Sequence, residues 1–153
     1  MRDVSWKESI EMCYKLAEII KKDNYKPDAL IGISRGGLIP LGILAYMLDV
    51  RDVYTISLKL YDENKIKNEV EQITPFHLED LEKYKRVLVI DDVVDTGTTI
   101  EYVLSKFKFG EIKVASLFYK PKKSKLKPDY YVEETEEWIN FPWSSLYFKD
   151  TFI

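Results

Sequence analysis

The sequence predicts an α/β fold with a mostly parallel, twisted sheet flanked by helices. Short apolar runs rich in β-branched residues alternate with segments of helical periodicity, a pattern typical of βαβ units. The chain has 153 residues, 46% of them hydrophobic, which is enough for one well-buried core and short for two. We therefore predict a single domain spanning residues 1–153, with ligands binding beyond the carboxyl ends of its strands.

The first predicted element is an amphipathic helix. Ser5 and Glu8 have the spacing of a capping box at its start, and the helix should end near Asp23. The stripe expected to face the core consists of Ile10, Cys13, Leu16, Ile19 and Ile20.

The remaining chain continues the alternation of strands and helices. Strands are predicted at 29–34, 53–60, 87–92 and 112–119, and a fifth begins at 130–132. Helices are predicted at 38–48 and 98–107. Residues 61–72 are polar, highly charged and without periodicity, so they predict a mobile excursion.

The composition excludes several classes of protein. The net charge is −3, so no global basic field indicates a nucleic-acid partner, and we expect none. Cys13 is the single cysteine, which excludes a disulfide framework and favours a reducing compartment. No apolar run reaches the roughly 18 residues that span a bilayer. We expect a cytoplasmic protein without stable membrane insertion.

The segment TGTT at 96–99 lies between a predicted strand and a predicted helix. Gly97 lets the backbone approach a ligand closely, and the first helical amides and the threonine hydroxyls supply donors for an anion such as phosphate. A threonine-capped helix start is the plainer interpretation of the same residues.

Three aspartates precede this turn. Asp91 and Asp92 are adjacent, so their charges repel, and their side chains should point to opposite faces of the strand. Such a pair persists most easily where hydroxyls or a metal ion occupy the carboxylate lone pairs. Asp95 follows just before the turn. We interpret the set as a site for a sugar phosphate with a divalent cation, since neither common glycine-rich nucleotide motif is present.

A second motif, SRGG at 34–37, follows the first predicted strand. Its backbone amides could form another anion nest, with Arg35 adding positive charge, or the segment could be a plain tight turn. Two anion sites and a carboxylate pair together indicate one substrate with phosphate groups at both ends.

These motifs resemble those of a known family. The segment IDDVVDTGTT is similar to the phosphoribosyl-pyrophosphate (PRPP) signature of the type I phosphoribosyltransferases, and ISRGGLIP resembles their pyrophosphate loop. The segments WINFPW and FYKP are similar to the bacterial xanthine-guanine phosphoribosyltransferases. The resemblance implies transfer of ribose phosphate from PRPP to a 6-oxopurine base (guanine, xanthine or hypoxanthine). The products would be pyrophosphate and a nucleoside monophosphate, as in purine salvage.

The resemblance also implies roles for the motif residues in binding PRPP. Asp91 and Asp92 would hold ribose hydroxyls directly or through Mg²⁺ and its waters. The 5-phosphate would bind Asp95, Thr96, Gly97, Thr98 and Thr99. Pyrophosphate would bind Ser34, Arg35, Gly36 and Gly37. The residues expected to act in catalysis are Asp91, Asp92, Asp95 and Arg35.

The base would bind under a small hood formed by the two ends of the chain. Lys120 maps onto the lysine that contacts the purine 6-oxo group. Trp138 would stack on the base and Ile139 would offer its backbone carbonyl to the exocyclic position, although a core role stays open for both. Asp95 would contact purine N7, either as a hydrogen-bond partner or as a base.

Two features on the second strand and after it are also interpreted through the resemblance. Lys59 would reach pyrophosphate, as a lysine does in related hypoxanthine-guanine enzymes, although the xanthine-guanine enzymes differ here. The excursion at 61–72 takes the place of the family's flexible loop, whose closure would exclude water.

Other functions stay open at this stage. The acceptor could be another base, including adenine. A different class of function is a regulator that keeps the PRPP site as a sensor. Apolar tail residues such as Phe148 and Phe152 indicate a subunit contact, so we expect a homo-oligomer, either a dimer or a tetramer.

Overall fold

The structure is a computed structural model that describes residues 1–60, 70–73, 77–107, 110–144, 146 and 148–149. The helices in this part of the chain are α1 (Trp6–Lys22), α2 (Leu38–Met47), α3 (Thr98–Lys106) and the short 3-10 helix η1 (Leu78–Leu81). The strands are β1 (Arg2–Asp3), β2 (Ala29–Ser34), β3 (Val53–Leu60), β4 (Val70–Gln72), β5 (Arg86–Val94), β6 (Glu111–Tyr119), β7 (Tyr130–Glu134) and β8 (Ile139–Asn140).

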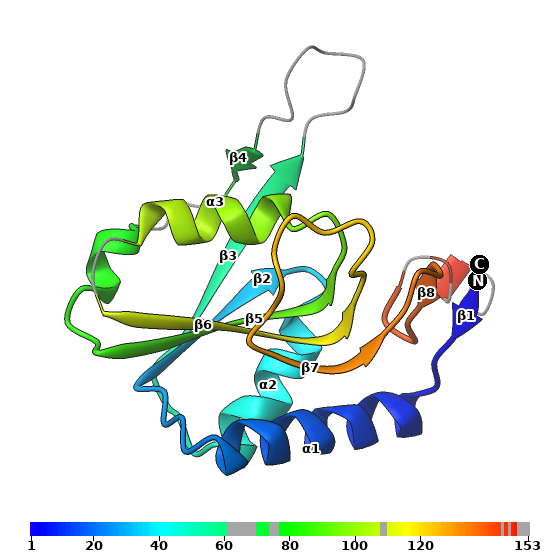
Figure 1. Ribbon diagram of the computed structural model, residues 1–153, viewed down its shortest axis with the longest axis horizontal. Coiled ribbons are helices and arrows are strands. Elements are labelled where there is room, and N and C mark those ends of the chain that lie inside the picture. The colour runs from blue at the N-terminus through cyan, green and yellow to red at the C-terminus, as the bar shows by residue number, and fades with distance from the viewer. Residues whose placement is uncertain (61–69, 74–76, 108–109, 145, 147, 150–153) are drawn as a thin grey trace.

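The main sheet has the strand order β4-β3-β2-β5-β6-β7. The central strand β2 pairs in parallel with β3 and β5, and β6 pairs in parallel with β5 and β7. The edge strand β4 runs antiparallel to β3. The predicted α/β class with a mostly parallel sheet is therefore confirmed, and the carboxyl ends of the parallel strands share one edge (Figure 1).

Helices cover both faces of this sheet (Figure 1). α1 and α2 pack against each other and bury one apolar cluster against one face, with Leu16, Leu44 and Phe118 fully enclosed. α3 covers the opposite face, where Ile56, Ile100 and other apolar side chains form a second cluster. Burying both faces explains why the central strands are continuous apolar runs.

Three predictions about local structure need correction. β5 continues two residues past Asp92, so the acidic pair lies within the strand rather than at its end. Residues 70–72 form β4, although the polar composition predicted an irregular excursion; residues 61–69 lie outside the described part of the chain. On α1, Ile10 and Ile19 are exposed because the buried stripe passes instead through Met12 and Ala17.

The start of α1 is also only partly as predicted. The Ser5 hydroxyl accepts a hydrogen bond from the Glu8 amide at 3.1 Å, which is one half of a capping box. The Glu8 carboxylate does not return to Ser5 but pairs with the Arg2 guanidinium at 2.7 Å. Arg2 also pairs with Glu133, and so the beginning of the chain is fixed to the end of β7.

The predicted hood is a separate two-stranded parallel sheet of β1 and β8. The Arg2 amide donates to the Trp138 carbonyl at 2.9 Å, and the Val4 amide donates to the Asn140 carbonyl at 3.0 Å. Figure 1 shows this hood at one end of the main sheet. No helix among the described residues combines the length and apolar character that crossing a membrane requires.

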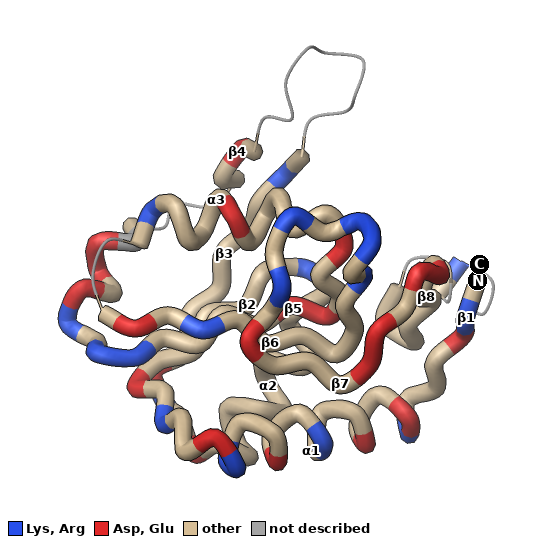
Figure 2. The backbone as a smooth tube through the Cα atoms, viewed as in Figure 1, with Lys and Arg blue, Asp and Glu red and all other residues tan. Residues whose placement is uncertain are grey.

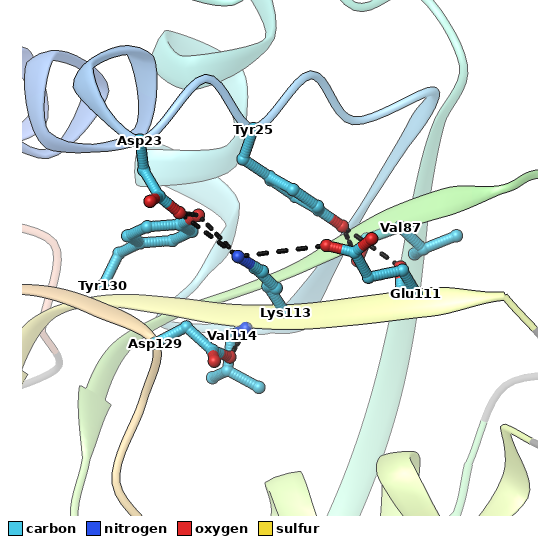
Figure 3. A network of polar contacts seen from close by, with 8 residues as sticks. All are labelled: Asp23, Tyr25, Val87, Glu111, Lys113, Val114, Asp129 and Tyr130. Atoms are coloured by element: carbon cyan, nitrogen blue, oxygen red, sulfur yellow. Dashed lines mark hydrogen bonds and ion pairs between the residues drawn. The ribbon is translucent and has the colours of Figure 1, made fainter.

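A polar network ties the end of α1 to β6 and β7 at the edge opposite the carboxyl ends (Figure 3). Lys113 donates to the Asp23 carboxylate at 3.2 Å, and the Tyr130 hydroxyl donates to the same oxygen. These contacts hold the pKa of Asp23 below its usual value, with the Tyr130 hydrogen bond as the larger cause. The exposure of Asp23 to solvent makes the network a means of orienting α1 rather than a large source of stability.

Within the same network, Tyr25 carries a larger expected effect on stability. Its buried hydroxyl lies 3.0 Å from the Val87 carbonyl and 3.1 Å from the Glu111 carbonyl, and it donates to these acceptors. Tyr25→Phe removes this donor from two strands, so we expect the free energy of unfolding to fall by about 1–2 kcal/mol. Urea denaturation measures this change. Tyr14→Phe is the matched control, because that ring is half exposed; equal effects of the two substitutions would contradict the prediction.

Candidate active site

The carboxyl ends of β5 and β6, the SRGG turn after β2, and the hood enclose a cavity of about 900 Å³. Its walls combine aromatic side chains from the hood with charged side chains from the strand ends. The lining residues are Arg35, Gly36, Leu38, Ile39, Asp92, Val93, Asp95, Lys120, Trp138, Ile139, Phe141, Trp143, Ser144, Phe148 and Lys149.

Seven of the residues predicted from the sequence line this cavity: Arg35, Gly36, Asp92, Asp95, Lys120, Trp138 and Ile139. The other predicted site residues lie outside the lining: Ser34, Gly37, Lys59, Asp91, Thr96, Gly97, Thr98 and Thr99. Lys59 is exposed on β3 opposite Glu71 of β4. Phe148, expected at a subunit contact, lines the cavity, and Phe152 is not among the described residues.

The acidic pair is held by backbone and indole donors. The Asp91 carboxylate accepts from the Asp92 amide at 2.9 Å, and the Asp92 carboxylate accepts from the Val93 amide at 2.8 Å. The second Asp92 oxygen accepts from the Trp143 indole at 3.2 Å. Burial raises the pKa of both aspartates, and for Asp91 the neighbouring charge of Asp92 raises it further.

The SRGG turn packs directly against Asp92. A Cβ atom at Gly36 would lie 2.3 Å from an Asp92 carboxylate oxygen, so any larger residue there would collide with the carboxylate. The Gly37 amide donates to the Ile33 carbonyl at 2.9 Å and is thus engaged within the turn. The amides of Arg35 and Gly36 meet no acceptor among the residues that the structure describes. The turn therefore presents two backbone donors and the Arg35 side chain beside the carboxylate.

Asp95 lies between two lysines of the loop that connects β6 to β7. Its Oδ2 atom is 3.5 Å from the Lys120 ammonium, and its Oδ1 atom is 2.9 Å from the Lys123 ammonium. Lys120 is 6% exposed, and its ammonium lies 5.9 Å from the centre of the Trp138 ring. Trp138 is 61% exposed, so a flat ligand could stack on its ring.

The TGTT turn begins α3 in the conformation that its glycine permits. Gly97 has a φ of 82°, and its carbonyl accepts the first helical hydrogen bond from Glu101. The Thr98 amide is taken by the Thr96 hydroxyl at 3.3 Å. The amides of Gly97 and Thr99 meet no acceptor within the described chain, and they remain available at the start of the helix.

The hood also contributes an aromatic stack that sequence reasoning did not assign. Trp143 lies parallel to Phe141 with ring centres 4.5 Å apart, and Trp6 of α1 packs against it at 5.8 Å. The indole of Trp143 thereby connects the hood to the Asp92 carboxylate. The WINFPW motif was a signal for this residue, although its partner could be found only in three dimensions.

Comparisons with known proteins identify the family of this chain. A family model described as "Phosphoribosyl transferase domain" matches residues 5–147. The xanthine-guanine phosphoribosyltransferase of Desulfotalea psychrophila is 33% identical over 93% of this chain and 85% of that protein.

Solved structures give the same result. A purine phosphoribosyltransferase from Pyrococcus horikoshii is 39% identical with a TM-score of 0.79, covering 94% of this chain and 95% of that one. A hypothetical protein from Neisseria gonorrhoeae with bound ppGpp is 28% identical with a TM-score of 0.80, covering 97% and 93%. The resemblance found in the motifs is confirmed along nearly the whole length of the sequence, and the chain belongs to the phosphoribosyltransferase family.

Proposed function

We propose that the protein transfers the 5-phosphoribosyl group of PRPP to a ring nitrogen of a 6-oxopurine, releasing pyrophosphate. The bond from ribose carbon-1 to pyrophosphate oxygen breaks, and a bond from carbon-1 to the purine nitrogen forms. The proton that this nitrogen loses passes to the released pyrophosphate or to solvent. The observation that carries the proposal is the shared cavity, in which Asp92 and Arg35 lie with Lys120 and Trp138. Acidic and basic residues suited to a sugar pyrophosphate thus adjoin residues suited to a flat base.

The base would stack on the exposed indole of Trp138, and the buried Lys120 would donate to the purine 6-oxo group. A buried ammonium beside an exposed ring fits a planar ligand with an electronegative edge. The strand pairing of the hood supports a role for Ile139. The Trp138 carbonyl accepts from Arg2 of β1 and the Asn140 carbonyl from Val4 just after it. Alternation along β8 therefore turns the Ile139 carbonyl away from this segment.

The charged residues would serve the sugar and the leaving group. Positive charge develops at ribose carbon-1 as pyrophosphate leaves, and Asp91 and Asp92 would hold the ribose in place near it. Arg35 and the open amides of the SRGG turn would bind pyrophosphate, and the TGTT turn would bind the 5-phosphate. Asp95 would accept a hydrogen bond from the purine.

The residues also fit a magnesium ion that arrives with the substrate. No group of three or more histidine, cysteine, aspartate or glutamate side chains suited to a metal occurs among the described residues. Mg²⁺ usually keeps several waters and takes one or two carboxylates plus substrate phosphates, which matches Asp91 and Asp92. When bound, the ion would neutralise the charge that develops on pyrophosphate. Asp91 and Asp92 would hold its waters and the ribose hydroxyls.

A second candidate function is a regulator that binds PRPP or a nucleotide without turnover. The bound ppGpp in the Neisseria gonorrhoeae structure favours it, because that chain shares the fold over nearly its whole length. The pairing of Lys120 with an exposed Trp138 favours the enzyme over a sensor of PRPP alone, since such a sensor has no need of a base site. A cytoplasmic location and a homo-oligomeric assembly stay predictions.

The test of the proposed function is pyrophosphate release from PRPP and Mg²⁺, measured separately with guanine, xanthine, hypoxanthine and adenine. We expect release with one or more 6-oxopurines, matched by formation of the nucleoside monophosphate, and little with adenine. Binding of PRPP or ppGpp without turnover of any base would support the regulator instead.

A further inference from the structure

The proposed function assigns no role to Lys123. It belongs to the basic run 120–127, whose lysines appear as blue segments on the loop between β6 and β7 (Figure 2). The sequence gives no reason to separate Lys123 from its exposed neighbours. In the structure its ammonium lies 2.9 Å from Asp95, which is closer than the ammonium of Lys120 at 3.5 Å.

Backbone hydrogen bonds fix the position of this loop relative to Asp95. The Lys120 amide donates to the Val94 carbonyl at 3.0 Å, and the Lys125 amide donates to the Thr96 carbonyl at 2.9 Å. Asp95 therefore lies between two points at which its own loop is attached to the lysine loop. Lys123 extends from the turn between those points, and its contact with Asp95 follows from the fold of both loops.

The two carboxylate oxygens of Asp95 have different surroundings. Oδ2 faces Lys120, the residue that the proposed function assigns to the purine. Oδ1 is buried and has no hydrogen-bond donor in suitable geometry within the described part of the chain; its close contact is the Lys123 ion pair. If Lys123 were absent, Lys120 would be the one ion-pair partner left to Asp95 among the described residues, and the two groups would be free to close on each other.

We propose that Lys123 is a positioning residue for the purine site, and this proposal rests on the proposed function. By holding Oδ1, Lys123 fixes the orientation of Asp95 and leaves Lys120 available for the oxo group of the base. Lys123 does not itself touch the reacting atoms. The benefit to the reaction comes from alignment, since a carboxylate displaced by about 1 Å can lower a rate by up to a hundredfold.

The test compares Lys123→Ala and Lys123→Arg with Lys122→Ala, which removes the same charge from an exposed neighbour in the same loop. We expect kcat/KM for the purine to fall roughly tenfold in Lys123→Ala, while KM for PRPP changes by less than about twofold. Lys123→Arg should recover most of the loss, because arginine keeps the charge that pairs with Asp95. Lys122→Ala should stay within about twofold of the parent protein.

Thermal unfolding of the same variants distinguishes positioning from a structural role. A half-exposed ion pair contributes little to stability, so Lys123→Ala should unfold within a few degrees of the parent protein. The proposal is overturned if Lys123→Ala and Lys122→Ala have the same kinetics. It is also overturned if kcat/KM of Lys123→Ala falls equally for purine and for PRPP and this fall follows the loss of thermal stability. Absence of turnover in the parent protein would instead contradict the proposed function itself.

Discussion

Replacing both Asp91 and Asp92 by asparagine should remove nearly all turnover and leave the fold intact. Asparagine preserves the size of each side chain and the carbonyl oxygen that accepts the neighbouring amide. It removes the negative charges that would face the developing positive charge of the ribose and the magnesium ion. We expect kcat for the 6-oxopurine to fall by more than about a hundredfold, measured as nucleotide formation at saturating PRPP and Mg²⁺.

The control for this double variant is Asp49→Asn. Asp49 is exposed after α2 and has a positive φ of 52°, a conformation that asparagine tolerates well. Its replacement should leave turnover unchanged. Near-normal turnover of the double variant, with a folded far-ultraviolet spectrum, would mean that the acidic pair does not hold the ribose or its metal.

The same aspartates give a prediction for the pH dependence of stability without metal. The pKa values of both aspartates are raised in the folded protein. Below the ordinary value of 3.8, the two carboxyl groups are protonated in the folded and in the unfolded protein, and their burial carries no charge penalty. As the pH rises through the raised values, the folded state must bury two charges and its stability falls. The site therefore lowers stability at neutral pH.

Asp91→Asn alone should therefore stabilise the metal-free protein at pH 7, by about 1 kcal/mol. Asp92→Asn should gain less stability. The asparagine side chain has one acceptor oxygen, so it cannot replace both carboxylate oxygens that accept from the Val93 amide and the Trp143 indole. Thermal unfolding from pH 4 to pH 8 in the presence of a chelator measures both variants, and the gain for Asp91→Asn should shrink toward low pH. A variant that is less stable than the parent protein at pH 7 would indicate that Asp91 is not held as a buried charge.

The strands and helices that follow from apolar patterning were predictable. The end of β5 and the edge strand β4 were not. β2 was predicted to the residue, because its apolar run is bounded by polar residues and a glycine turn. β5 extends beyond the predicted boundary, because pairing of Val93 and Val94 with β6 depends on backbone groups and continues through the charged residues. β4 was not predicted, since an edge strand in water needs no apolar side chains to pair.

The site residues that could be predicted are those whose side-chain chemistry and place in a motif near a strand end indicate their role. Asp92, Asp95, Lys120 and Trp138 were all found in motifs, and the shared edge of a parallel sheet brings them to one cavity. The roles of Lys123 and Trp143 depend instead on how a loop folds back and how the hood closes, and no local pattern carries that information.

The hood itself illustrates the same limit. β1 consists of two residues at the beginning of the chain, and its pairing with β8 joins segments that lie more than 130 residues apart. Neither segment has the length or alternation that identifies a strand from sequence. The resemblance to a family predicted a hood, but the hydrogen bonds that orient Ile139 could be derived only from the structure.

Gly36→Ala should strongly damage the SRGG turn and the carboxylate beside it. The added Cβ would lie 2.3–2.4 Å from three atoms of the Asp92 carboxyl group, well inside any real contact. Asp92 cannot simply rotate away, because its oxygens are held by the Val93 amide and the Trp143 indole. The turn or the carboxylate must move, so we expect kcat to fall by about a hundredfold and the free energy of unfolding by about 1–3 kcal/mol.

Gly42→Ala provides the matched control for this substitution. Gly42 lies within α2. Apart from its chain neighbours and the backbone of its own helix, no atom of the described residues is within 4 Å of the Cβ that alanine would add. Because glycine is unfavourable within a helix, this change should raise the free energy of unfolding by about 0.5–1 kcal/mol and leave turnover unchanged. Urea denaturation and kcat are measured for both variants.

If Gly36→Ala kept the parent kcat while Gly42→Ala behaved as expected, the close packing of the SRGG turn on Asp92 would not be required for the reaction. If urea denaturation shows that Gly36→Ala is fully folded under the assay conditions, a loss of kcat is due to the displaced carboxylate and not to unfolding.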